Sequence, residues 1–228
     1  MLDISGLETK IQCVFKNKNL LKEALTHRSY LNENTSWELP HNERMEYLGD
    51  AVLELAVSEE LFVKFPEFPE GQLTVLRASL VNYQILAKIA SEITLDKYIL
   101  MSRGEAKDTG KAREVILANA IESLIGAIYL DQDFEAARIF IHRFVLTHLE
   151  EILRTKSYKD PKSELQELVQ ERLRVTPTYR VLSEDGPAHQ RIFRVGVFFT
   201  EKLVAEGSGA SKQEAETEAA KNALKKST

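Results

Sequence analysis

The sequence predicts a multi-domain protein: an all-α helical domain over residues 1–153, a polar linker over 154–159, and a small α+β domain over 160–228. First, apolar residues recur every three or four positions up to Leu153, which is the period of an amphipathic helix. Second, the period changes after Asp160, where aromatic and β-branched runs typical of strands follow. The two parts of the chain therefore belong to different structural classes.

The predicted elements follow in order along the chain. The first domain has apolar periodicity for helices at Leu7–Phe15, Asn19–Thr26, Glu43–Phe65, Gln72–Ile93, Glu114–Leu130 and Phe134–Leu153, with turn signals at Phe65–Gly71 and Ser102–Gly110. The second has helices at Lys162–Leu173 and Lys212–Lys225 and strands at Thr178–Ser183, Gln190–Thr200 and Lys202–Gly207. Its order is therefore α-β-β-β-α.

Composition narrows the class of protein. The net charge is −5, which by itself argues against a nucleic-acid partner, because proteins that bind phosphates tend to be basic. Cys13 is the only cysteine, so we expect no internal disulfide, no cysteine-based zinc site and a reducing compartment. No signal-peptide pattern is visible, and the least charged run, Val115–Leu130, is too short to span a bilayer. These features predict a cytoplasmic protein without a membrane partner.

The helix over Glu43–Phe65 carries an acidic stripe. Its acids, at positions that stack on one face, are Glu43, Glu46, Asp50 and Glu54, and the face opposite them is assigned to Met45, Leu48, Val52, Leu55 and Ala56. Like charges at this spacing cost roughly 0.2–0.5 kcal/mol per pair, a cost that a bound cation would remove. Gly49 lies inside this helix, where glycine is unfavourable and often marks the close approach of another backbone. Spacing alone supports a solvated face and a metal site about equally.

Glu122 is the only charge in the apolar helix Ile116–Leu130. A buried carboxylate is costly unless it is paired or coordinates a metal. In one interpretation it pairs with Arg28 or Arg77. In the other, Asn119 and Glu122 are metal ligands that face the acidic stripe, and such oxygen ligands suit Mg²⁺ or Mn²⁺ rather than zinc. Burial of the acid favours the second.

Several ordered segments together resemble the bacterial ribonuclease III family. The segments are Asn42–Leu55 (NERMEYLGDAVLEL), Ala24–Glu33, Glu70–Asn82, Ser102–Glu105 and Ile116–Asp131. The C-terminal part is similar to a double-stranded-RNA-binding domain at Leu165–Gln170, Gly186–His189 and Gly207–Leu224. The resemblance spans essentially the whole chain, and five motifs in order are far more specific than any one alone.

This resemblance implies a Mg²⁺-dependent endoribonuclease, with Mn²⁺ as an alternative metal, that cuts double-stranded RNA, including ribosomal RNA precursors, to 5′-phosphate and 3′-hydroxyl ends. It implies a homodimer in which each protomer supplies one acidic cluster. By position it assigns metal binding to Glu46, Asn119 and Glu122, catalysis to Asp50 and Glu122, and auxiliary acidic roles to Glu43 and Glu70. Asn119 departs from the usual Asp, so we expect weaker metal binding and reduced cleavage.

The resemblance also implies how the second domain holds duplex RNA. The implied RNA-binding residues are Gln166 and Gln170 at one minor groove, His189 at the next, and Ser211 and Lys212 at the phosphates between. The family's second lysine is replaced by Gln213. Residues 160–228 hold eleven lysines and arginines and eleven acids, so the domain has no net charge. We expect modest, salt-dependent affinity.

Two other functions are compatible with the sequence. The chain could hold duplex RNA without cutting it, which Asn119, Gln213 and the acidic net charge favour. It could also be a helical scaffold or dimerisation domain whose buried acids pair with arginines.

Overall fold

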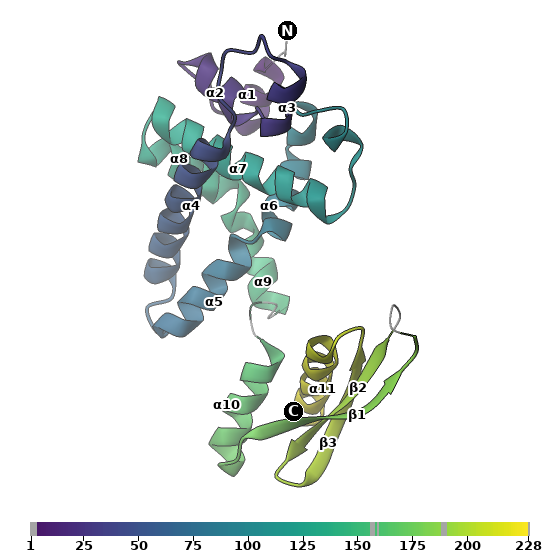
Figure 1. The fold of residues 1–228 in the computed structure, drawn as a ribbon. Coiled ribbons are helices and arrows are strands. Elements are labelled where there is room, and N and C mark those ends of the chain that lie inside the picture. Colours follow the sequence, from purple (N-terminus) through teal and green to yellow (C-terminus); the bar gives the residue numbers. More distant parts are fainter. Residues whose placement is uncertain (1–3, 156–157, 159, 188–190, 228) are drawn as a thin grey trace. The chain divides into compact units, whose positions relative to one another are not determined.

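The computed structural model describes residues 4–155, 158, 160–187 and 191–227 and divides the chain into two compact units, residues 1–158 and 159–228. The first unit is all-helical, and the second packs two helices against a three-stranded antiparallel sheet (Figure 1). The predicted fold class is confirmed.

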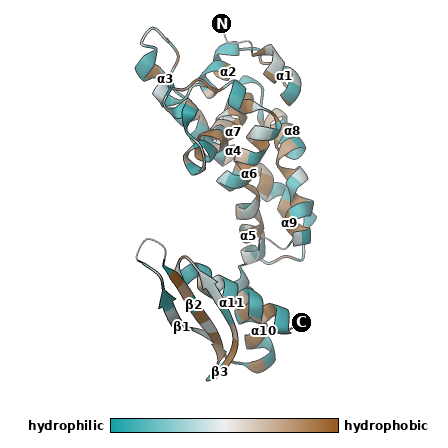
Figure 2. Ribbon diagram, turned by 90° about the vertical axis from the view of Figure 1, so that its right-hand side faces the viewer, coloured by the Kyte–Doolittle hydropathy of each residue, from teal (hydrophilic) through white to brown (hydrophobic). Residues whose placement is uncertain are grey.

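The helices of the first unit are α1 (Ser5–Ile11), α2 (Lys18–Ala24), α3 (Arg28–Glu33), α4 (Glu43–Lys64), α5 (Glu70–Leu80), α6 (Tyr83–Glu92), α7 (Lys111–Asp131), α8 (Phe134–Phe144) and α9 (Leu149–Thr155). Short 3-10 turns lie at Leu95–Lys97, Glu105–Lys107 and Leu146–His148. The hydrophobic segments of α4, α6 and α7 lie in the interior of this unit (Figure 2). Within the described part of the chain, no helix is both long enough and apolar enough to cross a membrane.

Two predicted helices are each divided in the structure, and one helix was missed. The single helix predicted over Gln72–Ile93 is two helices, α5 and α6, in the structure. The break lies at Asn82, which has extended backbone and whose side chain accepts a hydrogen bond from the Ile85 N–H at 3.0 Å, so that it caps a new helix. The prediction over Phe134–Leu153 breaks at the 3-10 turn, which keeps both Val145 and Leu149 in the core. Helix α3 is only six residues long and has too few turns to show a period.

The apolar face of α4 is also narrower than predicted. Met45, Val52 and Ala56 are buried in the core, whereas Leu55 is 58% exposed. Leu55 instead lines a surface groove between α4 and α5.

The second unit consists of α10 (Pro161–Leu173), β1 (Pro177–Asp185), β2 (Ile192–Phe199), β3 (Lys202–Gly209) and α11 (Lys212–Ser227). The strands pair in the order β1-β2-β3. Its core residues lie on one face of the sheet and on the two helices: Leu165, Val169, Val197, Ala205, Ala219, Ala220 and Ala223. Asp160 caps the start of α10 because its side chain accepts a hydrogen bond from the Lys162 N–H, and Pro161 is the first residue of the helix.

Candidate active site

The candidate site is set by a backbone-to-backbone crossing of α4 and α7. A Cβ atom on Gly49 would lie 1.7 Å from the carbonyl oxygen of Glu122, and one on Gly126 would lie 2.4 Å from the carbonyl oxygen of Met45. Only glycine therefore fits at either position, and the close approach predicted at Gly49 is confirmed. Because Glu46 and Glu122 lie one turn from these glycines, the crossing brings the acids of the two helices together.

The pKa shifts of the carboxyls show that they interact. Burial, and then the charges of Asp50 and Glu46, raise the pKa of Glu122 to about 8. The pKa of Glu46 is raised by burial and by Glu43, and less strongly by Asp50, while a hydrogen bond with the Asn119 side chain lowers it. Burial and then Glu54 raise the pKa of Asp50. The cluster thus has an excess of negative charge.

Neither arginine considered as a partner of Glu122 fills that role. Arg28 is 3.5 Å from Glu43, at the edge of the cluster, and Arg77 donates to the Ser58 hydroxyl at 2.8 Å. Among the described residues, Glu122 has no ion pair with any lysine, arginine or histidine. The interpretation in which Arg28 or Arg77 neutralises Glu122 is therefore wrong.

The residues of the cluster fit a divalent cation in their chemistry and charge. Glu46, Asn119 and Glu122 offer oxygen donors of the kind that Mg²⁺ prefers, and burial together with the charges of Asp50 and Glu46 raises the pKa of Glu122. In the described ranges, no three His, Cys, Asp or Glu side chains converge tightly enough to hold a metal by themselves. A metal held at this place would therefore need the amide of Asn119 as well as the carboxylates.

The two auxiliary acids lie in different places. Glu43 is half-exposed, 3.5 Å from Arg28 and 3.8 Å from His41, and its charge raises the pKa of Glu46. Glu70 begins α5, where its carboxylate accepts from the Thr74 hydroxyl at 2.9 Å. Glu70 is not among the charges that shift the pKa values of the cluster. Of these two acids, Glu43 borders the cluster and Glu70 does not.

Asn42 is a positioning residue that the sequence reasoning missed. Asn42 is 3% exposed. Its backbone N–H donates to the Thr26 carbonyl at 2.9 Å, and its side-chain amide donates to the backbone carbonyl of Ala24 at 3.3 Å. Its own carbonyl accepts from the Glu46 N–H at 2.9 Å and the Ser123 hydroxyl at 3.4 Å. Asn42 therefore ties the start of α4 both to α7 and to the segment before α3. An asparagine directly before an acidic helix was the available signal.

Four of the predicted RNA-binding residues of the second unit are described by the structure, and none of the four is buried. Gln166 and Gln170 are exposed on α10, one turn apart, opposite the buried Leu165 and Val169. The Ser211 hydroxyl accepts from the Glu214 N–H at 3.2 Å and so caps α11. The Lys212 ammonium lies 3.4 Å from Glu184 and 5.6 Å from the centre of the Phe193 ring. His189 lies outside the described residues.

Comparisons with known proteins match both units. Residues 17–149 match the Ribonuclease-III-like family, and residues 161–227 match the double-stranded RNA binding motif. A protein named Ribonuclease 3 from Dehalococcoides mccartyi is 44% identical over 98% of this chain and 94% of its own length. The chain belongs to the ribonuclease III family. It is an endoribonuclease of this type, with a nuclease domain followed by a double-stranded-RNA-binding domain.

Two further matches support the assignment to ribonuclease III. A Ribonuclease 3 from Enterococcus faecalis is 43% identical over 96% of this chain and 95% of its own length. The solved nuclease domain of ribonuclease III from Campylobacter jejuni is 45% identical, covers 64% of this chain and 97% of that domain, and superposes with a TM-score of 0.58. The Campylobacter jejuni domain is described as structurally flexible in a region involved in dimer formation.

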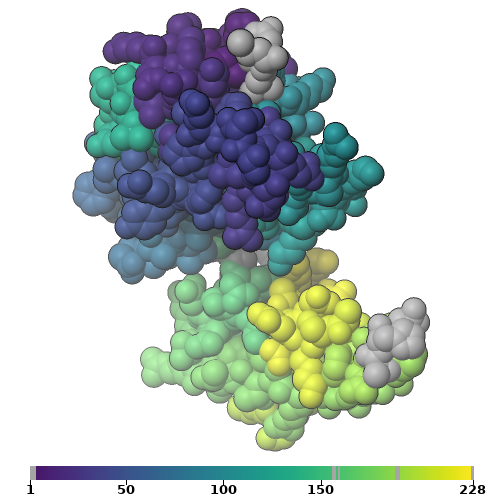
Figure 3. All heavy atoms as spheres, turned by 45° about the horizontal axis from the view of Figure 1, so that its top comes forward, coloured from purple at the N-terminus to yellow at the C-terminus, as the bar shows by residue number. Residues whose placement is uncertain are grey.

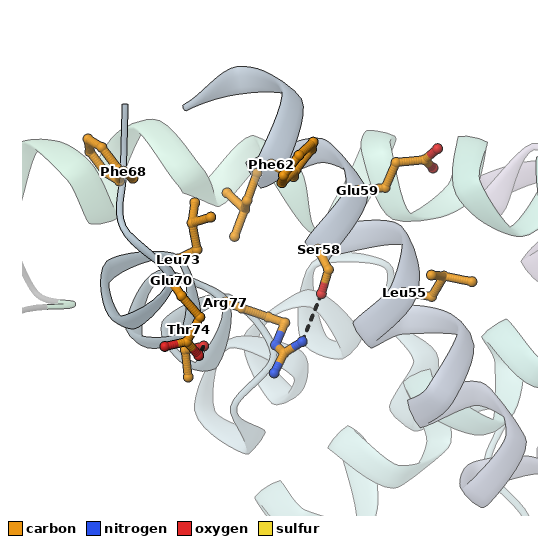
Figure 4. A pocket seen from close by; sticks show the side chains of 10 residues that line it. Leu55, Ser58, Glu59, Phe62, Phe68, Glu70, Leu73, Thr74 and Arg77 are labelled. Atoms are coloured by element: carbon orange, nitrogen blue, oxygen red, sulfur yellow. Dashed lines mark hydrogen bonds between the residues drawn. The ribbon is translucent and has the colours of Figure 1, made fainter. Parts of the chain in front are cut away.

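The nuclease domain also has an apolar groove between α4 and α5 (Figure 4). Its lining includes the apolar side chains of Leu55, Phe62, Phe68 and Leu73, together with the polar Glu70 and Arg77. Phe62 is 72% exposed and Leu55 58%. Exposed apolar side chains gathered in this way are typical of a protein interface.

Proposed function

We propose that this ribonuclease III requires Mg²⁺, or Mn²⁺ in its place, and hydrolyses double-stranded RNA to 5′-phosphate and 3′-hydroxyl ends. We assign it to the processing of ribosomal RNA precursors and other structured transcripts in the cytoplasm. The observation that supports the metal requirement is the cluster of Glu46, Asp50 and Glu122 at the Gly49–Gly126 crossing. None of these three acids has an ion pair with a cation among the described residues.

Glu46, Asn119 and Glu122 would hold the metal. A bound divalent cation supplies a more acidic water and stabilises the leaving oxygen of an in-line displacement. Without a cation, Glu122 has a pKa of about 8 and holds a proton at neutral pH, so that proton must leave before its carboxylate becomes a ligand. Asp50, exposed beside Gly49, would orient the attacking water. The water would lose a proton to solvent as its oxygen bonds to phosphorus, the bond from phosphorus to the 3′ oxygen would break, and that oxygen would take up a proton from solvent.

Asn119 sets the strength of this site. Its amide oxygen remains available to a metal, and its side chain is hydrogen-bonded to Glu46. An aspartate would add a negative charge and attract the cation more strongly. We therefore expect a site that works but needs more Mg²⁺ than one with aspartate.

The groove between α4 and α5 supports a homodimer. Burying Leu55 and Phe62 against a second copy would remove apolar surface from water at about 25 cal/mol per Å². Glu70 lines the same groove, so its auxiliary role would be exerted at the junction of the two protomers. Each protomer would contribute one acidic cluster, and each cluster would cut one strand.

The dimer is tested by sedimentation of Phe62→Glu. Because Phe62 lines the groove, a buried charge there should shift the protein to monomers. Val63→Glu is the matched control, since Val63 is 71% exposed but does not line the groove. Monomeric protein before mutation, or a Phe62→Glu variant that stays dimeric, would contradict the assignment.

In the RNA-binding domain, Gln166 and Gln170 would contact one minor groove and His189 the next, with Ser211 and Lys212 at phosphates. Exposure of the two glutamines on one face of α10 supports this arrangement. Duplex RNA is recognised by such shape and phosphate contacts rather than by base sequence.

A second candidate function is duplex binding with weak or no cleavage, which Asn119 favours because it removes one negative charge from the donor set. The two are separated by incubating a long RNA duplex with the full chain in Mg²⁺ or in EDTA. We expect fragments only with Mg²⁺, and 5′ ends that accept labelled phosphate only after phosphatase treatment. A shifted but uncut duplex would support binding alone.

Residue assignment requires a matched pair of variants on α7. Glu122→Ala should bind the duplex without cutting it, whereas Glu114→Ala, which removes an exposed acid from the first turn of the same helix, should cut normally. Full cleavage by Glu122→Ala would remove Glu122 from the catalytic residues.

A further inference from the structure

Glu184, at the end of β1, contacts two cations of the RNA-binding domain. One carboxylate oxygen lies 3.4 Å from the Lys212 ammonium, and the other lies 3.3 Å from a terminal nitrogen of Arg191. Arg191 directly precedes β2, and Lys212 begins α11. Glu184 therefore brings together cations from the start of β2 and the start of α11.

This three-residue cluster has a net positive charge, unlike other ion pairs of the same domain. Arg180 pairs with Glu201 through two hydrogen bonds of 3.0 Å, and Lys162 pairs with Glu216, each a neutral one-to-one pair. Glu184 has to neutralise two cations at once, so one positive charge remains. In a domain with no net charge, this is a place where an RNA phosphate is attracted.

Both cations of the cluster are open to a ligand. The Lys212 side chain is 58% exposed and that of Arg191 is 45% exposed. Exposed ion pairs contribute only about 0–1 kcal/mol, so a phosphate can displace the Glu184 carboxylate at little cost. Arginine presents paired N–H donors that match phosphate oxygens. Side chains of α11 form part of the surface of this domain (Figure 3).

We propose that Arg191 is a further RNA-phosphate-binding residue, which acts with Lys212 at one phosphate cluster, and that Glu184 competes with RNA for both cations. The inference rests on the proposed RNA-binding role of Lys212. Arg191 then supplies the second positive charge that Gln213 does not provide at the start of α11. Glu184 holds the two cations close together in the free protein but lowers their affinity for RNA.

The test measures binding of a blunt RNA duplex to the full chain by fluorescence anisotropy, in EDTA, over a series of NaCl concentrations. Arg191→Gln should weaken binding and lower the slope of log K against log salt by about 0.7–0.9, the contribution of one phosphate contact. Arg180→Gln is the matched control: it also removes one arginine charge, but from within β1, where Arg180 pairs with Glu201 of the β2–β3 turn, and it should leave the slope unchanged.

The competing role of Glu184 is tested by a variant that should strengthen RNA binding instead of weakening it. Two opposite charges about 4 Å apart in water attract each other with an energy equivalent to roughly a fivefold change in affinity. Glu184→Gln removes this attraction from the two cations, so it should bind RNA about fivefold more tightly. Glu201→Gln, which removes an acid from the Arg180 pair, is its control and should have a much smaller effect. The gain from Glu184→Gln should disappear in a chain that also carries Arg191→Gln and Lys212→Gln.

The outcomes separate this inference from the function on which it rests. A full chain that does not bind duplex RNA would overturn both. A wild-type chain that binds, with Arg191→Gln equal to Arg180→Gln in affinity and salt slope, would overturn the role of Arg191 alone. Weaker or unchanged binding by Glu184→Gln would overturn the competition.

Discussion

The acidic cluster and the face that we propose to bind RNA differ in what holds their side chains. At the cluster, two helix backbones touch through Gly49 and Gly126, and Glu46 and Glu122, one turn away, are partly buried. On the RNA-binding face, Gln166, Gln170 and Lys212 project from the surface of a small domain. The first region therefore depends on packing and buried charge, and the second on many exposed contacts of small individual effect.

The largest effect is expected at the helix crossing. Gly49→Ala places a methyl group 1.7 Å from the Glu122 carbonyl oxygen, so α4 and α7 must move apart. We expect a loss of about 3 kcal/mol in the free energy of unfolding and of at least about 100-fold in cleavage rate. Urea unfolding and a single-turnover cleavage assay would measure the two.

Gly71→Ala is the control for that variant, because nothing lies within 4 Å of a Cβ atom at Gly71, also on a helix. It should leave stability unchanged or raise it by up to about 1 kcal/mol. If Gly49→Ala were as mild as Gly71→Ala, the crossing would not set the geometry of the cluster.

The next effect is a pH dependence of stability that belongs to the cluster. Glu122 has a pKa of about 8 in the folded chain against 4.5 ordinarily, so its protonated form favours folding. This contribution is full below about pH 4.5 and is lost as the pH rises through about 8. In EDTA the free energy of unfolding should fall by roughly 2–4 kcal/mol over that window.

Glu122→Gln should remove most of this decrease in the free energy of unfolding. A smaller decrease should remain from Glu46 and Asp50, because their pKa values are raised in the same direction. Equal pH profiles of the two proteins in urea unfolding would show that the pKa of Glu122 is not raised by its partly buried position.

A smaller effect is expected from Asn119→Asp. The added charge should lower the Mg²⁺ concentration for half-maximal cleavage by about tenfold. In EDTA the same variant should be less stable than the wild type, because it loses the hydrogen bond with Glu46 and adds a like charge. Asn32→Asp, an exposed asparagine on α3, should change neither quantity. An unchanged Mg²⁺ titration in Asn119→Asp would count against Asn119 as a ligand.

The smallest effects should come from the RNA-binding face. Gln166→Ala and Gln170→Ala should each weaken duplex binding by only a few-fold, as expected for the loss of one neutral hydrogen bond of about 1 kcal/mol. Because amides carry no charge, the salt dependence of binding should not change. A change in salt slope would show that these residues act through phosphates instead of the minor groove.

The sequence predicted the cluster better than its surroundings. Three local features of the sequence indicated the cluster without knowledge of the fold: the spacing of Glu46 and Asp50, the isolation of Glu122, and the presence of Gly49 inside a helix. The roles of Arg28 and Arg77 could not be read, because their partners Glu43 and Ser58 depend on how α3, α4 and α5 pack.

Other differences have the same physical origin. Leu55 fits the apolar period of α4 but lines a groove, since a period does not distinguish a core from an interface. The break at Asn82 depends on a capping hydrogen bond that outweighs the apolar period. The contact of Glu184 with Lys212 and Arg191 arises only when β1, β2 and α11 assemble.

The most direct test of the metal centre is calorimetric titration of Mn²⁺ into the wild-type chain and into Glu122→Gln, without RNA. We expect saturable binding by the wild type, with release of a proton near pH 7, and loss of most of that binding in the variant. Binding of the same strength by both proteins would show that the metal is held elsewhere and that the cluster at the Gly49–Gly126 crossing is not the metal centre.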